Sequence, residues 1–203
     1  MTAEGVLAIG IGRGTKLLSS YLKGEYQAMD SHLWNVGNKK YEATGVLGYE
    51  TDTLDIHGNT LKEAPWEHVT DEAFDEAMSS MKGEYDQIPP LYSSKKYNGK
   101  RLRDYAIKNI SVDVKPAKII VHSIERVRTP GEELPKFGLR VSCSGGTYVR
   151  SIIRDIAYKL GTLGTMRSLV RTFKHNLSVD NSINVETIDY ETIVQNIITP
   201  NAM

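Results

Sequence analysis

The sequence predicts a mixed α/β fold, of the α+β kind, in which a largely antiparallel central sheet is flanked by helices. Two strand patterns follow each other closely, at residues 118–128 and 137–143, and a Pro- and Gly-containing loop joins them. Strands connected in this way usually pair antiparallel. Two helical patterns, at 69–83 and 148–161, carry apolar stripes that can cover one face of such a sheet.

The composition indicates a reduced intracellular protein with one sizeable core. The chain has 203 residues, enough for a single domain. Its mean hydropathy is −0.35 and no apolar run approaches about 18 residues, so a membrane-spanning protein is not expected. The N-terminus lacks the pattern of a secretory signal. Cys143 is the only cysteine, which excludes an intrachain disulfide and a cysteine metal cluster.

The net charge of zero conceals a segregation of charge along the chain. Residues 42–87 contain 12 acidic and 2 basic residues, whereas 92–128 contain 10 basic and 3 acidic ones. Residues 150–175 contain 6 basic and 1 acidic residue. This segregation favours one surface that faces a polyanion and one acidic surface in solvent. Charge runs are equally often only solvated faces, and that alternative stays open.

The first predicted element is a buried strand at GVLAIGIG (5–12), followed by a short helix at TKLLSSYLKG (15–24) that Gly24 ends. The glycines between them follow a G-x-G-x-G spacing. This fits neither the phosphate loop G-x-x-x-x-G-K-[ST] nor the dinucleotide fingerprint G-x-G-x-x-G. We therefore interpret these glycines as residues of a tight strand-to-helix turn.

A second strand is predicted at KKYEATGVLG (39–48), and TDTLDIHGNTLKE (51–63) follows as turn material. The residues expected on the buried face of the strand are Tyr41, Ala43 and Leu47. VTDEAFDEAMSSMKG (69–83) predicts a helix with Thr70 as its N-cap and Gly83 as its end. The core stripe of this helix consists of Phe74, Ala77, Met78 and Met81.

The later part of the chain predicts a strand pair and an amphipathic helix. In FGLRVSC (137–143) apolar and polar residues alternate. The inward residues are Phe137, Leu139, Val141 and Cys143, and the outward ones are Arg140 and Ser142. YVRSIIRDIAYKLG (148–161) predicts a helix with Arg150 and Arg154 one turn apart on its flank. Beyond Ile183 the helical pattern is weak.

The stretch QIPPLYSSKKYNGKRLRDYA (87–106) combines cations with tyrosines. Pro89 and Pro90 favour an extended backbone. The interleaved residues are Tyr92, Lys95, Lys96, Tyr97, Lys100, Arg101, Arg103 and Tyr105. Cations neutralise phosphates and tyrosines stack on bases, so this pattern predicts binding to an RNA loop or single strand. The alternative is a basic amphipathic surface helix.

Two further stretches bring together residue types that form sites. In CSGGTYVRSIIRD (143–155), Tyr148 and Arg150 stand at the start of a helix. An arginine on so apolar a helix needs a carboxylate partner or solvent. In the other stretch Tyr41 is followed closely by the acidic turn TDTLD (51–55), whose aspartates could simply cap the turn.

Together these segments resemble the TruB-type tRNA pseudouridine synthases, and among them the stand-alone eukaryotic members. TAEGVLAIGIGRGTK (2–16) is similar to the later part of the family motif G-T-L-D-P-x-A-x-G-V-L. KKYEATGVLGYETDTLDIHG (39–58) resembles K-x-Y…L-G-x-x-T-D-T-x-D. QIPPLYSSKKYNGKRLRDYA resembles Q-x-P-P-x-Y-S-A-x-K-x-x-G…Y-x-x-A. CSGGTYVRSIIRDIAYKLG (143–161) resembles C-x-x-G-T-Y-I-R-x-L-x-x-D-L-G-x-x-L-G, and LVRT (169–172) the L-x-R that follows.

The resemblance implies the pseudouridine synthase catalytic fold and the isomerisation of uridine 55 in the TΨC loop of tRNA to pseudouridine. Such an enzyme flips the uridine out, breaks its glycosidic bond and rejoins the base through C5. A carboxylate nucleophile performs this without a cofactor or metal. The implied partner is the tRNA T-arm, held by a thumb at about 88–115, and we expect a monomer without a PUA domain. The expected location is the nucleus or mitochondrion if the source is eukaryotic, and the cytoplasm otherwise.

The resemblance also implies roles for individual residues. Tyr41 would stack on the flipped uracil and help remove the C5 proton, and Tyr148 and Leu169 would line the base pocket. Arg150 would pair with the nucleophilic Asp, and Asp55 matches an acidic residue near the site. The thumb residues expected to bind RNA are Lys95, Lys96, Lys100, Arg101 and Arg103.

Two departures from the family pattern accompany the resemblance. In D-P-x-A the Ala corresponds to Ala3, so Met1 stands at the Pro position and the catalytic Asp would fall one residue before the chain begins. Asp52 and Asp55 belong to another motif and cannot replace it. The second departure is an insertion, EYQAMDSHLWNVG (25–37), which is either a surface loop or a translated unspliced intron.

The expectation is therefore a single partial catalytic domain at 1–203 that lacks its N-terminal strands and is inactive as it stands. An alternative is a non-catalytic tRNA-binding or RNA-folding protein that retains the thumb and the pocket. A third interpretation is a gene-model fragment that does not fold stably.

Overall fold

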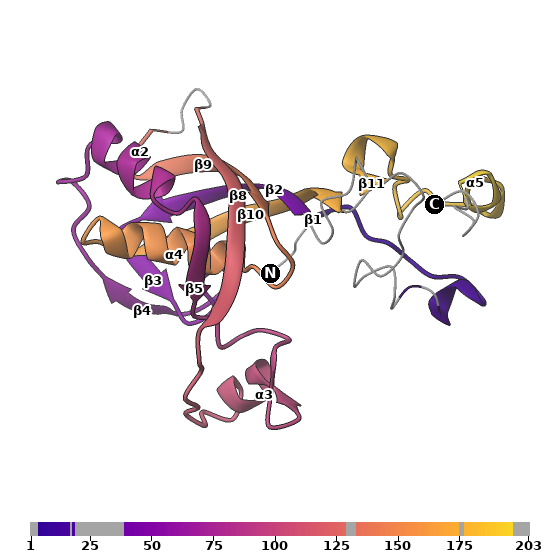
Figure 1. Cartoon of the computed structure of the whole chain (residues 1–203), viewed down its shortest axis with the longest axis horizontal. Coiled ribbons are helices and arrows are strands. Elements are labelled where there is room, and N and C mark those ends of the chain that lie inside the picture. The colour runs from indigo at the N-terminus through magenta and orange to yellow at the C-terminus, as the bar shows by residue number, and fades with distance from the viewer. Residues whose placement is uncertain (1–3, 17, 19–38, 129–132, 175–176, 197–203) are drawn as a thin grey trace.

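The computed structural model describes residues 4–16, 18, 39–128, 133–174 and 177–196. Within these ranges the centre is a seven-stranded sheet (Figure 1). Its strands are β1 (Glu4–Gly5), β2 (Lys39–Leu47), β5 (Gly83–Gln87), β8 (Ala117–Val127), β9 (Lys136–Cys143), β10 (Gly164–Lys174) and β11 (Leu177–Ser178). The order is β1-β10-β2-β9-β8-β5, with β11 on β10. Only β1 pairs parallel to its neighbour, so the predicted mixed and largely antiparallel sheet is confirmed.

The remaining elements are two small hairpins and several helices. The hairpin strands are β3 (Tyr49–Thr51) with β4 (Thr60–Glu63), and β6 (Lys96–Tyr97) with β7 (Lys100–Arg101). The helices are α2 (Asp71–Ser79), α3 (Leu102–Ala106), α4 (Val149–Lys159), α5 (Tyr190–Gln195) and a 3-10 turn (Val179–Asn181). Figure 1 shows α2 and α4 against the sheet, α3 projecting away from it, and α5 apart from the main body.

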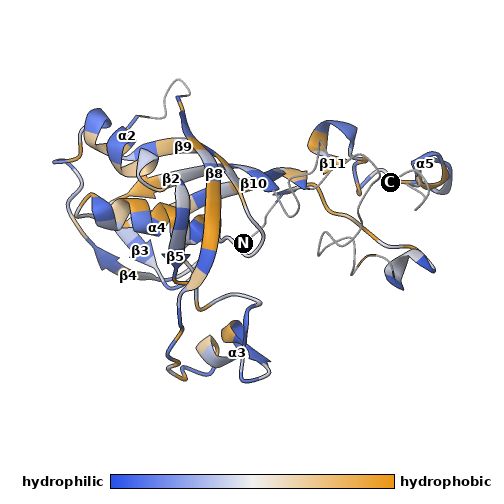
Figure 2. Cartoon of the chain, in the orientation of Figure 1, coloured by the Kyte–Doolittle hydropathy of each residue, from blue (hydrophilic) through white to orange (hydrophobic). Residues whose placement is uncertain are grey.

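The core lies between the sheet and the helices α2 and α4. As predicted, the inward residues of β9 have no exposed surface; they are Phe137, Leu139, Val141 and Cys143. The buried residues of α4 include Val149, Ile152, Ile153, Ile156 and Ala157, which confirms the apolar stripe. Figure 2 shows hydrophobic residues gathered on α4 and the strands beside it. The burial of these apolar faces is the main stabilising contribution to the sheet–helix packing.

The helix α2 begins where the sequence predicts but ends earlier. The Thr70 hydroxyl accepts a hydrogen bond from the Ala73 amide at 3.2 Å, so the N-cap is confirmed. The helix ends at Ser79, and Gly83 begins β5 with a φ of 108°. The prediction that Gly83 ends the helix is therefore wrong. A glycine tolerates this positive φ, which here starts a strand.

A buried arginine attaches α2 to the sheet. Arg126 of β8 is paired with Asp71 at 2.6 Å and with Asp75 at 3.3 Å. Its guanidinium also lies over the Phe74 ring, 4.7 Å from the centroid. The side chain of Arg126 is only 6% exposed, so these contacts hold its charge inside the packed layer.

The predicted buried strand at 5–12 is wrong. Only Glu4 and Gly5 pair, with Val170 and Arg171 of β10, and Val6 is buried beside them. The apolar residues that follow are 59–70% exposed; they are Leu7, Ile9 and Ile11. No described strand pairs with residues 6–11, so their apolar side chains are not covered. Residues 14–16 and 18 are helical, and the rest of the predicted helix and the insertion at 25–37 lie outside the described residues.

Several strands lie where no strand was predicted, among them β4, β5 and β10. The segment 51–63 is a turn only as far as residue 59, because Thr60–Glu63 forms β4. The strand β5 follows α2 and forms an edge of the main sheet, and β10 lies between β1 and β2. At the other end of the chain, the described part of the weak pattern, residues 184–196, contains one short helix, α5. Within the described residues, no helix has the length and apolar character required to cross a membrane.

Candidate functional site

The acidic turn after β3 is folded around the Asp55 carboxylate. Thr53 donates its hydroxyl hydrogen bond to Asp55 Oδ1 at 3.0 Å, and the His57 amide donates to the same oxygen at 3.1 Å. Thr51 donates to the Asp55 carbonyl at 2.7 Å. The turn is joined to β10 by a bridge between Asp55 and Met166. Asp52, by contrast, accepts hydrogen bonds from Asn59 and closes the turn, as an aspartate in a turn commonly does.

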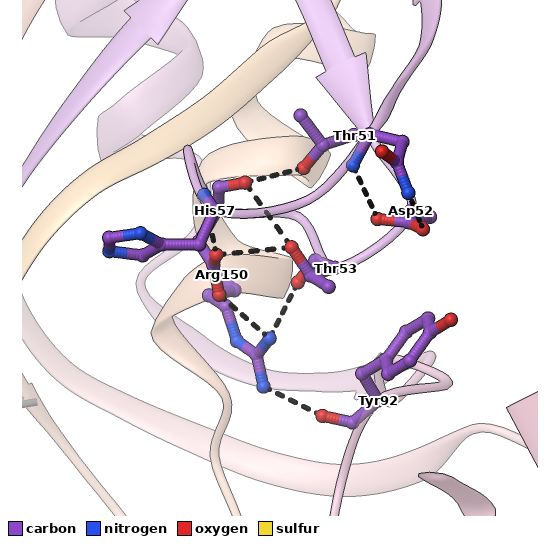
Figure 3. Close-up of polar contacts among 8 residues, drawn as sticks. Thr51, Asp52, Thr53, His57, Tyr92 and Arg150 are labelled. Carbon is purple, nitrogen blue, oxygen red and sulfur yellow. Dashed lines mark hydrogen bonds and ion pairs between the residues drawn. The ribbon is translucent and has the colours of Figure 1, made fainter. Parts of the chain in front are cut away.

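Arg150 is the ion-pair partner of this turn. Its Nη1 lies 3.1 Å from Asp55 Oδ2 and donates to the Thr53 carbonyl at 2.5 Å. Its Nη2 donates to the Tyr92 carbonyl at 3.0 Å. Figure 3 shows the guanidinium between the turn and Tyr92. The Asp55 and Arg150 side chains are 3% and 13% exposed, so this is a buried pair. Burial lowers the pKa of Arg150 from its usual value, and the Asp55 carboxylate opposes that shift.

A buried glutamine fixes the start of α4. The side-chain oxygen of Gln87 accepts from the Tyr148 amide at 2.9 Å, and its Nε2 donates to the Tyr148 carbonyl at 3.1 Å. The same Nε2 donates to the Tyr85 hydroxyl at 2.9 Å. The side chain of Gln87 therefore satisfies both backbone groups of Tyr148, the residue that caps α4. This places the start of α4 directly on the end of β5.

The segment that leaves β5 is attached to α4 at three further points. Ser151 donates to the Ile88 carbonyl at 2.9 Å, and Arg154 donates to the same carbonyl at 3.1 Å. The third point is the contact of Arg150 with Tyr92. All three donors, Arg150, Ser151 and Arg154, come from the first two turns of α4. They hold the extended segment that contains the Pro-Pro pair. The root of the projecting thumb is therefore rigidly joined to the Arg150 site.

The thumb, residues 88–116, is a small folded unit that carries the basic side chains. Leu102 is buried at its centre, and the rings of Tyr97 and Tyr105 pack edge to face at 5.8 Å. The Leu102 amide donates to the Lys95 carbonyl at 2.8 Å. Of the five predicted RNA-binding cations, Lys96, Lys100, Arg101 and Arg103 are exposed and Lys95 is half-buried; Lys108 and Lys115 are further exposed cations of the thumb. The alternative interpretation of this stretch, a basic amphipathic surface helix, applies only to the short helix α3. The β6–β7 hairpin precedes this helix.

Tyr41 and Leu169 lie on the core-facing side of the sheet. Tyr41 of β2 is paired with Val141 on one side and Arg171 on the other, and Leu169 lies opposite Ala43. Tyr41 is 8% exposed. Burial raises the pKa of its phenol, which the nearby Arg171 opposes, so the phenol is protonated at neutral pH. Tyr41 therefore offers a neutral aromatic ring beside Leu169.

Among the predicted site residues, the structure brings Asp55 and Arg150 into contact. Leu169 follows Met166, the residue that bridges to Asp55, on the same strand, and it lies beside the β2 residue Ala43. The five predicted RNA-binding cations belong to the thumb, whose helix α3 projects away from the sheet. The resemblance assigned Arg150 to a nucleophilic Asp, but here the guanidinium pairs with Asp55. Gln87 was not among the predicted site residues; its signal in the sequence is a glutamine separated by one residue from the Pro89-Pro90 pair.

Replacing Gln87 with Leu is expected to destabilise the protein by about 1–3 kcal/mol, because it leaves the buried Tyr148 amide without its partner and removes one of the two hydrogen bonds to the Tyr148 carbonyl, which keeps the bond from the Ile152 amide. Thermal unfolding measured by circular dichroism tests this. Glu84→Gln on the same strand, where the side chain is exposed, is the matched control and should leave the melting temperature unchanged. Equal stability of the two variants would contradict the role of Gln87.

Comparison with known proteins gives consistent matches. Residues 1–149 match the model of the TruB family pseudouridylate synthase N-terminal domain. The chain is 40% identical over 196 residues to tRNA pseudouridine synthase B of Clostridium tetani, covering 97% of this chain and 62% of that protein. It is 38% identical over 171 residues to pseudouridylate synthase TRUB1 of Mus musculus, covering 84% of this chain and 46% of that protein. The chain thus spans about three fifths of the length of its bacterial relatives.

A solved structure shares the fold. A chain in the crystal structure of a Cbf5-Nop10-Gar1 complex superposes with a TM-score of 0.51 at 23% identity. The superposition covers 78% of this chain and 37% of that chain. At this identity the similarity supports the fold, which is the mixed, mostly antiparallel arrangement described above.

Proposed function

Because the chain belongs to the TruB family of pseudouridylate synthases, we propose that its site serves the isomerisation of uridine 55 in the T-loop of tRNA to pseudouridine. The observation that supports this most strongly is the buried Asp55–Arg150 pair, joined both to β10 and to the root of the thumb. In this reaction the N1–C1′ bond of uridine breaks and a C5–C1′ bond forms. The C5 proton leaves and N1 gains one, so no cofactor is required.

The pocket residues are suited to holding a flipped base. Tyr41 supplies a neutral ring for stacking on the uracil, and Leu169 and Tyr148 supply further apolar surface. Stacking on an aromatic ring contributes roughly 1–3 kcal/mol per base. The thumb carries seven cations, which can neutralise the phosphates of the RNA arm. The site therefore combines base stacking with backbone binding.

We propose that the nucleophilic carboxylate is not among these 203 residues. The carboxylate of Asp55 is already occupied by Arg150, Thr53 and the His57 amide. In the parallel pairing of β1 with β10, Glu4 is level with Val170. Further along the same strand, Met166 is bonded through its backbone to Leu54 and Ile56, the neighbours of Asp55. The pairing of β1 with β10 would direct a preceding carboxylate towards Asp55 and Arg150.

The experiment that tests the RNA-binding part uses the 203-residue chain and a T-arm hairpin RNA. We expect salt-dependent binding, followed by fluorescence anisotropy. Replacing Lys96, Lys100 and Arg101 together with Gln should weaken binding and reduce the slope of log K against log salt by about 0.7–0.9 for each lost phosphate contact. Lys62→Gln on β4, an exposed lysine outside the thumb, is the matched control. No binding at low salt would contradict the proposal.

A second candidate function is non-catalytic tRNA binding or RNA folding. The observation that favours it is the thumb, which has its own buried residue and ring pair and contains every predicted RNA-binding cation. Acceleration of the refolding of a tRNA transcript by the 203-residue chain would support this function. Binding without such acceleration would argue against it.

A further inference from the structure

Two lysines face each other across the sheet beside the proposed pocket. Lys39 of β2 is directly opposite Lys174 of β10, and Tyr41 is opposite Arg171 in the same pair of strands. Like charges directly opposite each other destabilise an antiparallel pair. Lys174 is only 8% exposed, so water screens its charge poorly. The arrangement therefore costs stability unless an anion lies among these cations.

Within the described ranges, no carboxylate offsets these charges. Neither Lys39 nor Lys174 forms an ion pair there, and the Arg171 guanidinium donates to the Val6 carbonyl, a neutral acceptor, at 2.8 Å. The neighbouring thiol and phenol carry no negative charge at neutral pH either. Burial raises the pKa of the Cys143 thiol, opposite Lys39, to about 11, and it also raises the pKa of Tyr41.

The pKa values of both lysines are lowered, by burial and by the neighbouring cations. Burial lowers the pKa of Lys174 to about 8, and the charges of Arg171 and Lys39 contribute to the shift. The pKa of Lys39 is also lowered, first by burial and then by Arg171. A bound anion would oppose both shifts, because it favours the charged form of each amine.

We propose that Lys39, Arg171 and Lys174 form an anion subsite that binds an RNA backbone phosphate next to the nucleotide in the pocket. Lys39 precedes Tyr41 by two residues and Arg171 follows Leu169 by two, so each cation lies on the same face as a pocket residue. A phosphodiester is the anion that accompanies every base in RNA. The inference rests on the proposed function, because that function places the base beside Tyr41.

The test compares the 203-residue chain with its Lys174→Met variant. Binding of a T-arm hairpin RNA is measured by anisotropy across a salt series. The variant should bind on the order of 10-fold more weakly at low salt, with its salt slope reduced by about 0.7–0.9. It should also melt at a higher temperature than the parent chain, because the repulsion between Lys39 and Lys174 is relieved. Lys62→Met is the control for removing an exposed lysine, and neither quantity should change.

A pH series gives a second readout. Between about pH 7 and pH 8.5 Lys174 loses its proton, so RNA affinity should fall more for the parent chain than for Lys174→Met. Cys143 and Tyr41 have raised pKa values, and Lys39, whose pKa is also lowered, is present in both the parent chain and the variant. In the absence of RNA, the unfolded state binds more protons at Lys174 from about pH 8 to 10.5. The stability of the parent chain should therefore rise with pH in that window relative to the variant.

The outcomes separate this inference from the proposed function. If the parent chain binds the hairpin and Lys174→Met has the same affinity and salt slope, the subsite is wrong and the thumb alone accounts for binding. A second outcome is that inorganic phosphate raises the melting temperature of the parent chain, while Lys174→Met leaves the salt slope of RNA binding unchanged. In that case the three cations bind free phosphate, and the assignment to an RNA phosphate is overturned. If the parent chain does not bind the hairpin at all, the proposed function itself fails.

Discussion

A polypeptide in which Thr-Leu-Asp precedes the chain and proline replaces Met1 is expected to form pseudouridine in T-arm RNA, whereas the 203-residue chain is expected to form none. The added carboxylate restores the family motif D-P-x-A at Ala3. The pairing of Glu4 with Val170 would direct it towards the Asp55–Arg150 pair. Loss of a nucleophile typically lowers a rate by several orders of magnitude. Release of tritium from RNA labelled at C5 of uridine measures the reaction.

The control for this prediction is the same extended polypeptide with Asn in place of the added Asp. It should have the stability of the active one and release no tritium. Pseudouridine formation by the unextended chain would show that a residue within the 203 performs the nucleophilic step. Activity of the Asn control would lead to the same conclusion.

Replacing Asp55 with Ala is expected to destabilise the protein by about 3–5 kcal/mol, because it leaves the guanidinium of Arg150 buried without its counter-ion. The His57 amide loses its acceptor in the same variant, and the Thr53 hydroxyl keeps only its bond to the backbone carbonyl of residue 55. Chemical denaturation measures the difference. The largest local change is expected in the turn at 51–59 and at the thumb root, where amide hydrogen exchange should increase.

Two matched variants distinguish the ion pair from a general effect of altering the turn. Asp52→Ala removes a carboxylate from the same turn that forms no ion pair with a described residue, and it should cost about 1 kcal/mol. The double variant Asp55→Ala with Arg150→Met removes both charges, so it should be more stable than the sum of the single changes implies. Strict additivity would contradict a direct interaction between Asp55 and Arg150.

The elements predicted best are those whose residues alternate or repeat clearly. In β9, every second residue is apolar, and all four inward side chains are fully buried. In α4 the apolar stripe follows the helical period along the whole element. These patterns depend on local geometry alone, so the sequence suffices to locate them.

The strand β10 could not be located in this way. It contains Arg167, Arg171 and Lys174, which interrupt an apolar alternation, and its pairing with β2 has two register shifts. Its position between β1 and β2 depends on partners far away in the chain. The opening segment shows the reverse: residues 6–11 are apolar enough for a strand, but no described strand pairs with them. Apolar composition without a partner does not form a sheet.

For the candidate site, residue chemistry predicted part of the arrangement. An arginine on the apolar α4 required a carboxylate or solvent, and the structure shows the carboxylate of Asp55. From the sequence alone, that aspartate could be interpreted simply as a turn cap. Its contact with Arg150 was not predictable, because the two residues are far apart in the sequence. The bonds from Gln87 to Tyr148 were not predictable for the same reason: a buried amide is recognised only when its partners are known.

The most direct test of the account is to map pseudouridine at single-nucleotide resolution on a full tRNA transcript after incubation with the extended polypeptide. We expect modification at uridine 55 alone, and its loss in the control with Asn in place of the added Asp. Modification at another position, or equal modification by the Asn control, would contradict it.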